Sequence, residues 1–553
     1  MFAPNRRRVL QASSGLLLSA FLPRWAASAA PGLQVVSGPD IALSIDHLSM
    51  TVDGHTSHAI GVNGTAPGPL IRLREGQRVR IAVTNNLHED SSIHWHGLLL
   101  PFQMDGVPGI SFPGIRPGET FIYEFPVIQS GSYWYHSHSN LQEQMGHYGP
   151  LVIDPADAGT PAHDREHVIL LSDHSLLHPH EIMRRLKLDP GGFNRQKQTL
   201  SGLLAGRDQP MKDRLEWGNM RMDPTDISDV TGVAYTYLVN GHGPADNWTG
   251  LFTPGERIRL RVINASAMTN FNVRIPGLPL EIVAADGLDV RPVMVDEFQI
   301  AVAETYDLIV RPGDAAYTIV GEAIDRSGMA RATLAPRPTM TAPVPPLRSR
   351  PIATMKDMGM NMGGMDHSGH AMDMSMRNGA NAPQVRLGPG VQTIAPMPAD
   401  RTGDPPQGLE NVGHKVLVYG DLAAARPNPD LRPPSRSMEI HLTGNMERYM
   451  WSLDGETLSD VTAPIPFTLD ERVRVTLVND TMMNHPIHLH GHYFELVTGH
   501  GDHAPRKHTV NVAPGSKLTF DLTADAEGDW AFHCHMLYHM HAGMFEIVTV
   551  RAA

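Results

Sequence analysis

Three segments spread over the length of the chain repeat one pattern, a turn followed by a strand and then an asparagine. Residues 73–97 read LREGQRVRIAVTNNLHEDSSIHWHG, residues 253–275 read TPGERIRLRVINASAMTNFNVRI, and residues 469–491 read LDERVRVTLVNDTMMNHPIHLHG. In each copy apolar and polar residues alternate before the asparagine (Asn85, Asn264 or Asn479). Such alternation indicates a strand with one buried face. The chain is therefore predicted to consist of three related β domains.

A second pair of segments supports the repeat. Residues 116–139 and 513–536 both run from a Pro-Gly turn through an alternating strand to an aromatic residue and then His-x-His. Many short strands, frequent Gly and Pro turns and little helical periodicity favour an all-β fold of β-sandwiches. We expect domain one at 38–155, domain two at 165–335 and domain three at 411–553. Residues 336–410 are rich in Pro, Gly and Met and read as a linker, and residues 176–222 as a helical or irregular insertion.

The first 30 residues have the features of an export signal. Arg6, Arg7 and Arg8 precede an apolar run at 15–22, and small residues follow at 27–29. This resembles a twin-arginine signal peptide and predicts a periplasmic protein with no membrane span after signal removal. The alternatives are an ordinary secretory signal or a membrane anchor, although the run is too short to span a bilayer comfortably. A formal net charge of −13 argues against nucleic acid as a partner.

Four histidine motifs occupy the ends of the repeated strands in the first and third copies, whereas the middle copy has none. They contain His94 and His96, His136 and His138, His485 with His488 and His490, and His533 with His535. Because residues i and i+2 of a strand point to one face, each His-x-His pair can present two imidazoles to one point. Histidines alone would also suit zinc.

The only cysteine of the chain, Cys534, lies between His533 and His535, and His539 and Met544 follow it. A thiolate, two imidazoles and a weak axial thioether form a blue-copper electron-transfer site. On a strand the sulfur of Cys534 faces away from its two neighbouring imidazoles. The sequence therefore predicts two metal sites back to back, joined through this residue.

The four motifs, in this order, resemble the multicopper oxidases, the family of laccases, ascorbate oxidase and bacterial cuprous oxidases, and most of all the periplasmic copper-resistance oxidases. Supporting strings are DGVPGISFPGIRPGE (105–119), GPLVIDP (149–155), YTYLVNG (235–241), VAETYDLIV (302–310) and APRKHTVNVAPG (504–515). The resemblance covers nearly all of the chain after the signal. It implies three cupredoxin-like Greek-key β-sandwich domains and four copper ions, one type 1, one type 2 and two type 3.

The resemblance also implies a ligand set. Type 1 copper takes His485, Cys534, His539 and Met544; type 2 takes His94 and His488; type 3 takes His96, His136 and His535 on one ion and His138, His490 and His533 on the other. The trinuclear cluster then lies between domains one and three, with domain two as a spacer. Other nearby histidines (His492, His500, His503, His508 and His541) fill no family position and are expected at the surface or behind the ligands.

Such an enzyme takes single electrons from a donor, passes them through Cys534 and its neighbours, and reduces dioxygen to two waters. Asp105 matches an acidic residue that family members place near the cluster, and we expect it to donate protons or hydrogen bonds there. The alternative is a turn residue in Asp105-Gly106. Some bacterial cuprous oxidases have a Glu just after the type 1 His, where this chain has Met540. The second proton-relay residue is thus not identified.

A methionine-rich tract suggests the donor. Residues 355–376 read MKDMGMNMGGMDHSGHAMDMSM, and the spacing fits neither helix nor strand, so we expect a flexible insertion outside the core. Soft thioethers select Cu(I), so the tract is predicted to bind additional copper. The candidate substrate-copper residues are Met355, Met358, Met360, Met362, Met365, His367, His370, Met372, Met374, Met376 and, beside the type 1 site, Met483.

The sequence therefore predicts a periplasmic oxidase that oxidises Cu(I), with phenols as further donors, in the service of copper resistance. Other periplasmic copper-handling proteins are candidate partners. Two alternatives remain: a copper-sequestering protein whose oxidase activity is incidental, and a laccase for organic phenols. An axial Met should keep the type 1 potential moderate, which suits an easily oxidised donor better than a difficult phenol.

Overall fold

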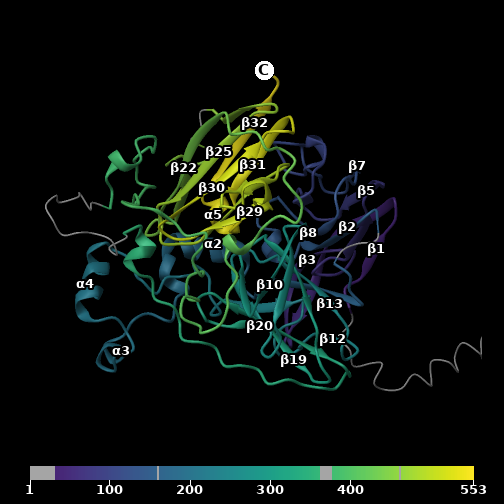
Figure 1. The fold of residues 1–553 in the computed structure, drawn as a ribbon, viewed down its shortest axis with the longest axis horizontal. Coiled ribbons are helices and arrows are strands. Elements are labelled where there is room, and N and C mark those ends of the chain that lie inside the picture. The colour runs from purple at the N-terminus through teal and green to yellow at the C-terminus, as the bar shows by residue number, and fades with distance from the viewer. Residues whose placement is uncertain (1–31, 158–160, 361–375, 460–462) are drawn as a thin grey trace, which may run out of the picture.

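A computed structural model describes residues 32–157, 161–360, 376–459 and 463–553. The predicted signal peptide lies outside these residues. The described chain is built mainly of β-strands, as predicted, and contains no helix with the length and apolar character needed to cross a membrane. Its strands form six sheets, paired into three sandwiches (Figure 1).

Domain one pairs a four-stranded sheet, β3-β2-β5-β7, with a five-stranded sheet, β1-β4-β9-β8-β6. Its strands are β1 (Val35–Ser37), β2 (Asp40–Val52), β3 (His55–Val62), β4 (Leu70–Arg74), β5 (Arg78–Asn85), β6 (His94–His96), β7 (Thr120–Pro126), β8 (Gly131–His136) and β9 (Tyr148–Asp154). Its core includes Trp95, Tyr123 and Tyr135, all fully buried.

Domain two pairs a six-stranded sheet, β11-β10-β13-β18-β15-β16, with a five-stranded sheet, β12-β20-β19-β14-β17. Its strands are β10 (Arg165–Ser175), β11 (Tyr235–Val239), β12 (Thr249–Leu251), β13 (Ile258–Asn264), β14 (Phe271–Arg274), β15 (Leu280–Ala285), β16 (Leu288–Val295), β17 (Glu297–Ile300), β18 (Thr305–Val310), β19 (Tyr317–Ala323) and β20 (Met329–Ala335).

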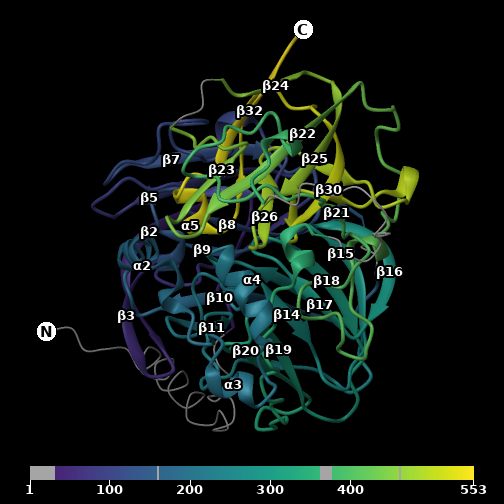
Figure 2. The same ribbon diagram turned by 90° about the vertical axis from the view of Figure 1, so that its left-hand side faces the viewer.

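Domain three pairs a sheet in the order β23-β22-β25-β30-β27-β28, with β21 added beside β30, and a five-stranded sheet, β24-β32-β31-β26-β29. Its strands are β21 (Ala399–Asp400), β22 (Arg436–Asn445), β23 (Met450–Leu453), β24 (Ile465–Thr468), β25 (Arg472–Asn479), β26 (His485–Leu489), β27 (Phe494–Leu496), β28 (Arg506–Lys507), β29 (Thr509–Val512), β30 (Ser516–Thr523), β31 (Gly528–Cys534) and β32 (Phe545–Arg551). Figure 2 shows domain three above domain two, with domain one beside both.

The repeated segments form equivalent strands, β5, β13 and β25. Each pairs in parallel with one neighbour and antiparallel with another. The asparagine that ends each strand is fully buried and hydrogen-bonds to the loop after it: Nδ2 of Asn85 donates to the carbonyl of Glu89, and Nδ2 of Asn479 donates to that of Met483. Buried amides must be hydrogen-bonded. The repeated asparagine therefore fixes the loop that leads into the histidine motifs of domains one and three.

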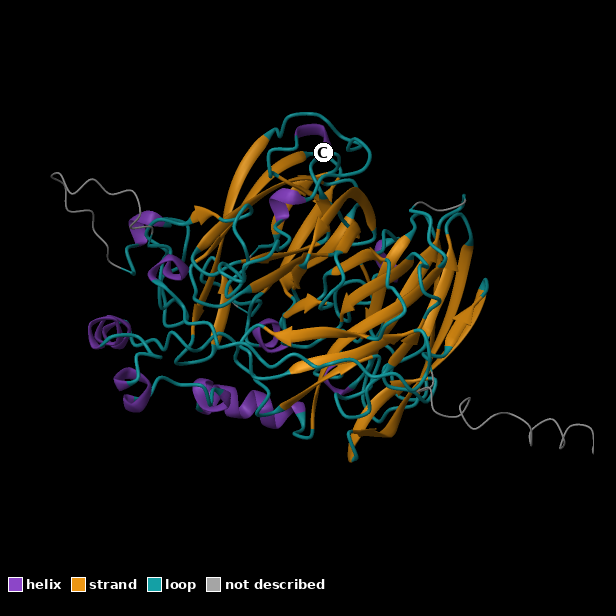
Figure 3. Cartoon of the chain, turned by 60° about the horizontal axis from the view of Figure 1, so that its bottom comes forward, coloured by secondary structure: helices purple, strands orange, loops and turns teal. Residues whose placement is uncertain are grey.

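Helices are few among the described residues, and Figure 3 shows most of them at the left and lower side of the molecule, with further short turns near the top and centre. The α-helices are α2 (Pro179–Leu188), α3 (Leu200–Leu204), α4 (Met211–Asn219) and α5 (Leu537–His541), and the short 3-10 helices are η2 (Phe102–Met104), η3 (Glu143–Met145), η4 (Pro190–Phe193), η5 (Met355–Met358), η6 (Gly379–Asn381), η7 (Tyr419–Asp421) and η8 (Gly501–His503). The predicted insertion at 176–222 contains α2, η4, α3 and α4.

The described parts of the 336–410 segment pack against the domains. β21 pairs with β30 of domain three, and Met358 on η5 is only 2 % exposed in a cluster with Trp217 and Met482. The expectation that the methionine tract lies entirely outside the core is wrong for Met358. An irregular segment can bury an apolar side chain without showing any period in its sequence.

Candidate metal centres

Two strand pairs bring the histidine motifs together. In domain one, β6 pairs with β8 so that His94 lies opposite His136. In domain three, β26 pairs with β31 so that His488 lies opposite His533 and Ile487 opposite Cys534. The alternation of strand side chains then sends the histidines to one side of β31 and the cysteine to the other.

Eight histidines from domains one and three converge where these strands meet. Their potential ligand atoms lie within 4.8 Å of one another in overlapping groups: His94, His96 and His488; His96, His136 and His535; and His138, His490 and His533. The second and third groups contain the residues of the two type 3 sets that the resemblance implies, and the first contains the type 2 pair together with His96. In the closest pair, Nε2 of His490 lies 3.0 Å from Nε2 of His533.

The outer nitrogens of these rings are held by hydrogen-bond acceptors. Nδ1 of His94 donates to the carbonyl of Asp105 at 2.7 Å, Nδ1 of His488 donates to the carbonyl of His508 at 2.7 Å, and Nδ1 of His533 donates to that of Cys534 at 3.0 Å. Such partners fix the tautomer and the orientation of a metal-binding imidazole. The opposite nitrogen of each ring is left to act as a ligand.

Apart from the contact between His490 and His533, seven ring nitrogens of the cluster have no hydrogen-bond partner among the described residues. Buried nitrogens without a hydrogen bond are Nε2 of His94, His136, His138 and His488, Nδ1 of His96, and both ring nitrogens of His535. Orphaned buried polar atoms are rare in folded proteins and need an explanation such as an ion. A set of imidazole donors without nearby thiolates suits copper in the trinuclear arrangement of the family.

The protonation of the cluster also suits metal binding. Burial, followed by repulsion from neighbouring histidines, holds the pKa of His96, His136, His138, His488, His490 and His535 well below the usual value. Burial lowers the pKa of His533 to about 4. Neutral imidazoles are the form that binds a metal.

A second centre lies on the other side of β31. Sγ of Cys534 is 3.6 Å from Nδ1 of His485 and 3.7 Å from Nδ1 of His539, and the two nitrogens are 3.2 Å apart. The helix α5 carries His539, and the turn after it brings fully buried Met544 back to Cys534, whose N–H donates to the Met544 carbonyl. Burial raises the pKa of the Cys534 thiol, so a thiolate here requires a bound cation.

Domain two contributes a residue that the sequence analysis missed. Oδ2 of Asp229 accepts a hydrogen bond from Nε2 of His539 at 2.6 Å and another from the hydroxyl of Tyr449 at 3.1 Å. Asp229 belongs to no motif and lies 310 positions from His539. Domain two is therefore more than a spacer.

Two buried carboxylates contact the histidine cluster. Asp105, as expected, reaches it: Oδ2 accepts from Nδ1 of His490 at 2.9 Å, and Oδ1 lies 3.4 Å from Nδ1 of His94. Glu143, which the sequence analysis also missed, lies on η3 and places Oε2 2.7 Å from Nδ1 of His136. Burial raises the pKa of Glu143 well above its usual value. Its only sequence signal is its position seven residues after His136.

A cavity of about 840 Å³ between domains two and three is lined by four methionines and by acidic and basic side chains. Met220 and Met222 follow α4, and Met446 and Met482 come from domain three. Asp223 and Asp226 also line it. Oδ1 of Asp226 is buried without a hydrogen bond, and burial together with the charges of Asp229 and Asp223 raises the pKa of Asp226 well above its usual value.

The predicted substrate-copper residues divide into three groups. Met355, Met360 and Met376 pack against the cluster of Met358 and Met482, so both flanks of the methionine tract adjoin this cavity. Met483, in contrast, is buried in the main hydrophobic core, and its neighbour Met482 lines the cavity instead. The remaining candidates, Met362, Met365, His367, His370, Met372 and Met374, lie outside the described residues.

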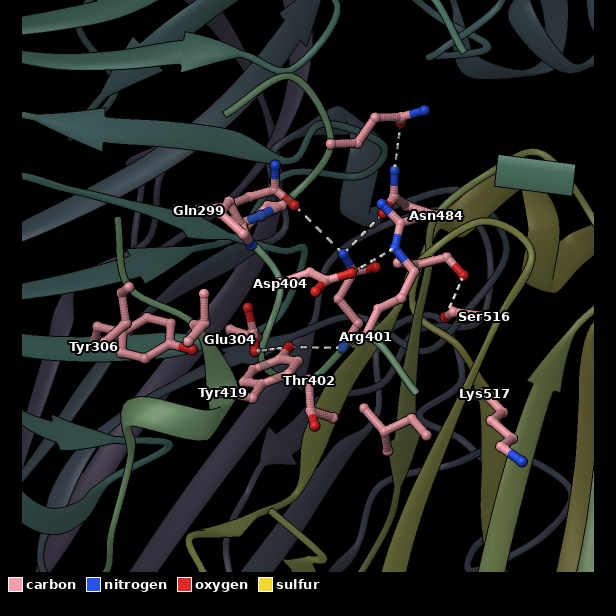
Figure 4. A pocket seen from close by; sticks show the side chains of 18 residues that line it. Gln299, Glu304, Tyr306, Arg401, Thr402, Asp404, Tyr419, Asn484, Ser516 and Lys517 are labelled. Carbon is pink, nitrogen blue, oxygen red and sulfur yellow. Dashed lines mark hydrogen bonds and ion pairs between the residues drawn. The ribbon is translucent and has the colours of Figure 1, made fainter. Parts of the chain in front are cut away.

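Another pocket lies where domain two, the 336–410 segment and domain three meet (Figure 4). No histidine, cysteine or methionine lines it. The hydroxyl of Tyr419 donates to Glu304, and the Asn511 side chain donates to that of Asn484, which precedes His485. Its contacts therefore support the strand that carries His485 and offer no soft metal ligand.

Comparison with known proteins identifies the family. Models described as multicopper oxidase match residues 44–158, 211–338 and 431–553. Copper resistance protein A of Escherichia coli is 46% identical over 566 residues, covering 93% of each chain. A homologue of copper resistance protein A from Pseudomonas syringae pv. tomato is 46% identical over 96% of this chain and 95% of its own.

More distant proteins share the architecture. Multicopper oxidase MmcO of Mycobacterium tuberculosis is 30% identical over 98% of this chain and 95% of its own. The crystal structure of the laccase from Botrytis aclada superposes with a TM-score of 0.65 at 22% identity, covering 95% of this chain and 89% of that one. The three sandwiches are thus cupredoxin-like, as the resemblance implied. The chain belongs to the multicopper oxidase family, the oxidoreductases that bind type 1, type 2 and type 3 copper.

Proposed function

We propose that this protein is a periplasmic oxidase that converts Cu(I) to Cu(II) and couples the oxidation of four Cu(I) ions to the reduction of one dioxygen to two waters. It thereby serves copper resistance. Two relatives named for copper resistance, each 46% identical over nearly the whole chain, support this role. The observation that carries the choice of Cu(I) as donor is the methionine-lined cavity, to which Asp226 contributes three positions before Asp229, the partner of His539.

The cavity has the chemistry of a Cu(I) site. Four methionines from domains two and three line it, and thioethers are ligands that select Cu(I). The buried, unpartnered Oδ1 of Asp226 adds an oxygen that a cation would satisfy. A phenol pocket is expected instead to be mostly apolar and aromatic with few placed polar groups.

A short route connects the cavity to the cysteine centre. Asp226 lines the cavity, and Asp229, three positions later, accepts a hydrogen bond from the ligand candidate His539. From Cys534 the chain continues directly into His533 and His535 of the histidine cluster. One strand thus joins the site that receives electrons to the site that uses them.

The proposed ligands are those of the family pattern. His485, Cys534, His539 and Met544 would hold type 1 copper, His94 and His488 type 2, and the remaining six histidines the type 3 pair. The bound coppers supply one-electron transfer and the reduction of dioxygen. The protein's share is to orient the rings, exclude water and deliver protons.

Asp105 is the proposed proton donor. It is 2 % exposed and contacts His94 and His490 from the two halves of the cluster. A buried carboxylate in hydrogen-bond reach of the reacting site is placed for general acid catalysis. Cys534 is the proposed electron carrier, since it adjoins both centres.

The proposal has three further parts. The protein is exported by the twin-arginine pathway, its methionine tract binds copper, and other periplasmic proteins deliver copper to it. The tract supports this proposal because its flanking Met360 and Met376 pack beside Met482 at the cavity. Soft ligands on these flanking residues would raise the local concentration of the donor at the cavity.

The test compares donors in oxygen-uptake assays on the copper-loaded protein. Met446→Leu and Met482→Leu remove thioethers at little cost in packing, because Leu and Met have similar volumes. We expect kcat/KM for Cu(I) to fall at least tenfold while that for a phenol stays within about twofold. Met211→Leu, at an exposed position on α4 outside the cavity, is the matched control.

Each alternative predicts another outcome. An equal loss for Cu(I) and phenol would contradict a Cu(I) site, and unchanged Cu(I) oxidation with high phenol turnover would identify a laccase for organic donors. If cells that carry Cys534→Ser keep their copper tolerance, the protein acts by sequestration and its oxidase activity is incidental.

A further inference from the structure

Three histidines outside the four motifs lie together on the surface of domain one. Nδ1 of His47 is 2.9 Å from Nε2 of His58, with ring centroids 4.8 Å apart, and the ring of His88 lies 5.9 Å from that of His47. All three side chains are exposed. The mechanism proposed above uses none of them.

The two closest histidines occupy neighbouring strands of an antiparallel pair. His47 on β2 is opposite Ile60 on β3, and His58 is opposite Ser49, so the two histidines are diagonal neighbours on one face. Diagonal positions in such a pair are within reach of long or aromatic side chains. The strands therefore hold the two imidazoles together without any flexible loop.

The inward-facing side of β2 changes from buried to exposed at His47. Ile41, Leu43 and Ile45 on β2 are buried in the core of domain one, but the next residue of that alternation, His47, is exposed. A hydrophobic residue would continue the pattern if the second sheet still covered this face. Instead the face opens to solvent at the histidine pair.

The loop that carries His88 is anchored to the same strand. The N–H of Asn86 donates to the carbonyl of Ile45 at 2.9 Å, and its side chain donates to Oδ1 of Asp46 at 2.9 Å. Next to His88, Glu89 accepts hydrogen bonds from Asn140 and Gln142. The backbone of the loop that carries His88 is thus fixed on both sides of this residue. The exposed side chain of His88 can still rotate quickly toward the other two rings.

The nitrogen spacing matches that of the copper cluster in the same molecule. The 2.9 Å between His47 and His58 compares with 3.0 Å between His490 and His533, which belong to one group of ligand candidates. Two nitrogens that bind one ion at about 2.0 Å lie about 2.8 Å apart in the square arrangement that Cu(II) prefers, and about 3.3 Å apart around tetrahedral zinc. The two rings hydrogen-bond to each other at 2.9 Å, a separation that one bound ion can replace with little movement, and Cu(II) binds imidazole donors more tightly than the other first-row divalent ions do.

The charge state of the cluster agrees with this. Partial burial, and then the proximity of His58 and His88, lowers the pKa of His47. A ring that stays neutral near pH 7 is ready to bind a metal ion. The nearby carboxylates of Glu89 and Asp46 favour a cation at the same place.

We propose that His47 and His58, with His88 as a third imidazole, form a surface site for one Cu(II) ion, separate from the four resident coppers. Cu(II) is also the product of the proposed reaction, but binding here does not depend on that reaction. If the protein oxidises Cu(I), the site would retain product ions at its surface.

The test adds copper sulfate to the four-copper holoenzyme and follows binding by calorimetry and by electron paramagnetic resonance. Wild type is compared with the His47→Ala/His58→Ala double variant, and His55→Ala, an exposed histidine on the same β3 strand, is the control. We expect the double variant to bind one Cu(II) fewer per chain and to lose a signal with imidazole nitrogen coupling. The His88→Ala variant should still bind this ion, but with an affinity that is severalfold lower. Any copper that the methionine tract binds is present in every variant, so it does not contribute to the difference in copper count between them.

Three results would overturn the proposal. One is an equal copper count in wild type and the double variant, which would leave the histidines as a hydrogen-bonded pair. Another is an equal loss in His55→Ala. The third is binding of zinc sulfate at the same place with the same affinity, which would contradict the preference for Cu(II). Unchanged oxygen uptake and type 1 absorption in the double variant confirm that it is folded, and an anomalous diffraction peak between His47 and His58 locates the ion.

Discussion

Nε2 of His539 lies 2.6 Å from Oδ2 of Asp229, so a residue of domain two makes a direct hydrogen bond to a proposed type 1 copper ligand in domain three. Trp451 stacks on the other side of the same ring at 4.0 Å between centroids. The orientation of His539 is thus set by two domains, and Asp226, three positions before Asp229, lines the methionine-lined cavity. Through this contact domain two helps to orient a proposed type 1 copper ligand.

Asp229→Asn should change the type 1 centre without unfolding it. Loss of a negative charge beside the site disfavours the more positive oxidised ion, so we expect the reduction potential to rise. Oxidation of Cu(I) should slow by about 10- to 100-fold, as is common for outer partners of metal-bound histidines. Redox titration of the type 1 absorption and oxygen uptake measure the two effects. Asp213→Asn on α4 is the control, and an unchanged potential in Asp229→Asn would contradict the assigned role.

Glu143→Gln should weaken the histidine cluster while sparing the cysteine centre. Oε2 of Glu143 lies 2.7 Å from Nδ1 of His136, which also donates to the carbonyl of Ser137, and an amide in its place can carry no negative charge. We expect oxygen uptake or copper retention at the type 3 site to fall by about 10- to 100-fold. Copper content per chain, read together with an intact type 1 absorption, measures this. Glu124→Gln, at an exposed position, should have no effect, and equal loss of type 1 copper in Glu143→Gln would argue for general unfolding.

The fold class and the meeting of the histidine motifs could be predicted because both depend on local pattern. Period-two spacing decides which side chains share a strand face, and the repeat indicates which strands are equivalent. The structure confirms the all-β fold and brings His94, His136, His488 and His533 together through the two strand pairs.

Other parts of the site could not be predicted because they depend on long-range packing. Asp229 reaches His539 across 310 positions of sequence, and nothing beside it marks it as a partner. The methionines illustrate the same limit. Met482 and Met483 are adjacent, yet one lines the cavity and the other enters the core. The path of the backbone after Asn479 determines which of the two side chains faces the cavity and which faces the core.

Lys507→Met should destabilise the contact between domains two and three. Nζ of Lys507 is fully buried and lies 3.0 Å from Asp286 and 3.1 Å from Glu304, both of domain two. Removing one partner of a buried ionic network leaves uncompensated charge and costs about 3–5 kcal/mol. We expect the thermal midpoint measured by calorimetry to fall by several degrees. Lys517→Met, an exposed lysine on β30, should leave it unchanged, and adding Glu304→Gln to Lys507→Met should restore part of the loss.

Removal of copper should lower thermal stability in two separable steps. Seven ring nitrogens of the histidine cluster are buried without a protein hydrogen bond, and each such group costs about 1–3 kcal/mol when nothing satisfies it. A ligand that binds only the folded state also stabilises it by mass action. The melting temperature is therefore expected to be highest for the copper-loaded protein, lower for Cys534→Ser, which lacks type 1 copper but keeps the histidine cluster, and lowest for the protein stripped by a chelator. Scanning calorimetry on the three forms, with copper added back to the stripped form as the control, measures the order. Equal midpoints for the loaded and stripped proteins would show that the unpaired nitrogens are satisfied in some other way and would argue against a metal-filled cluster.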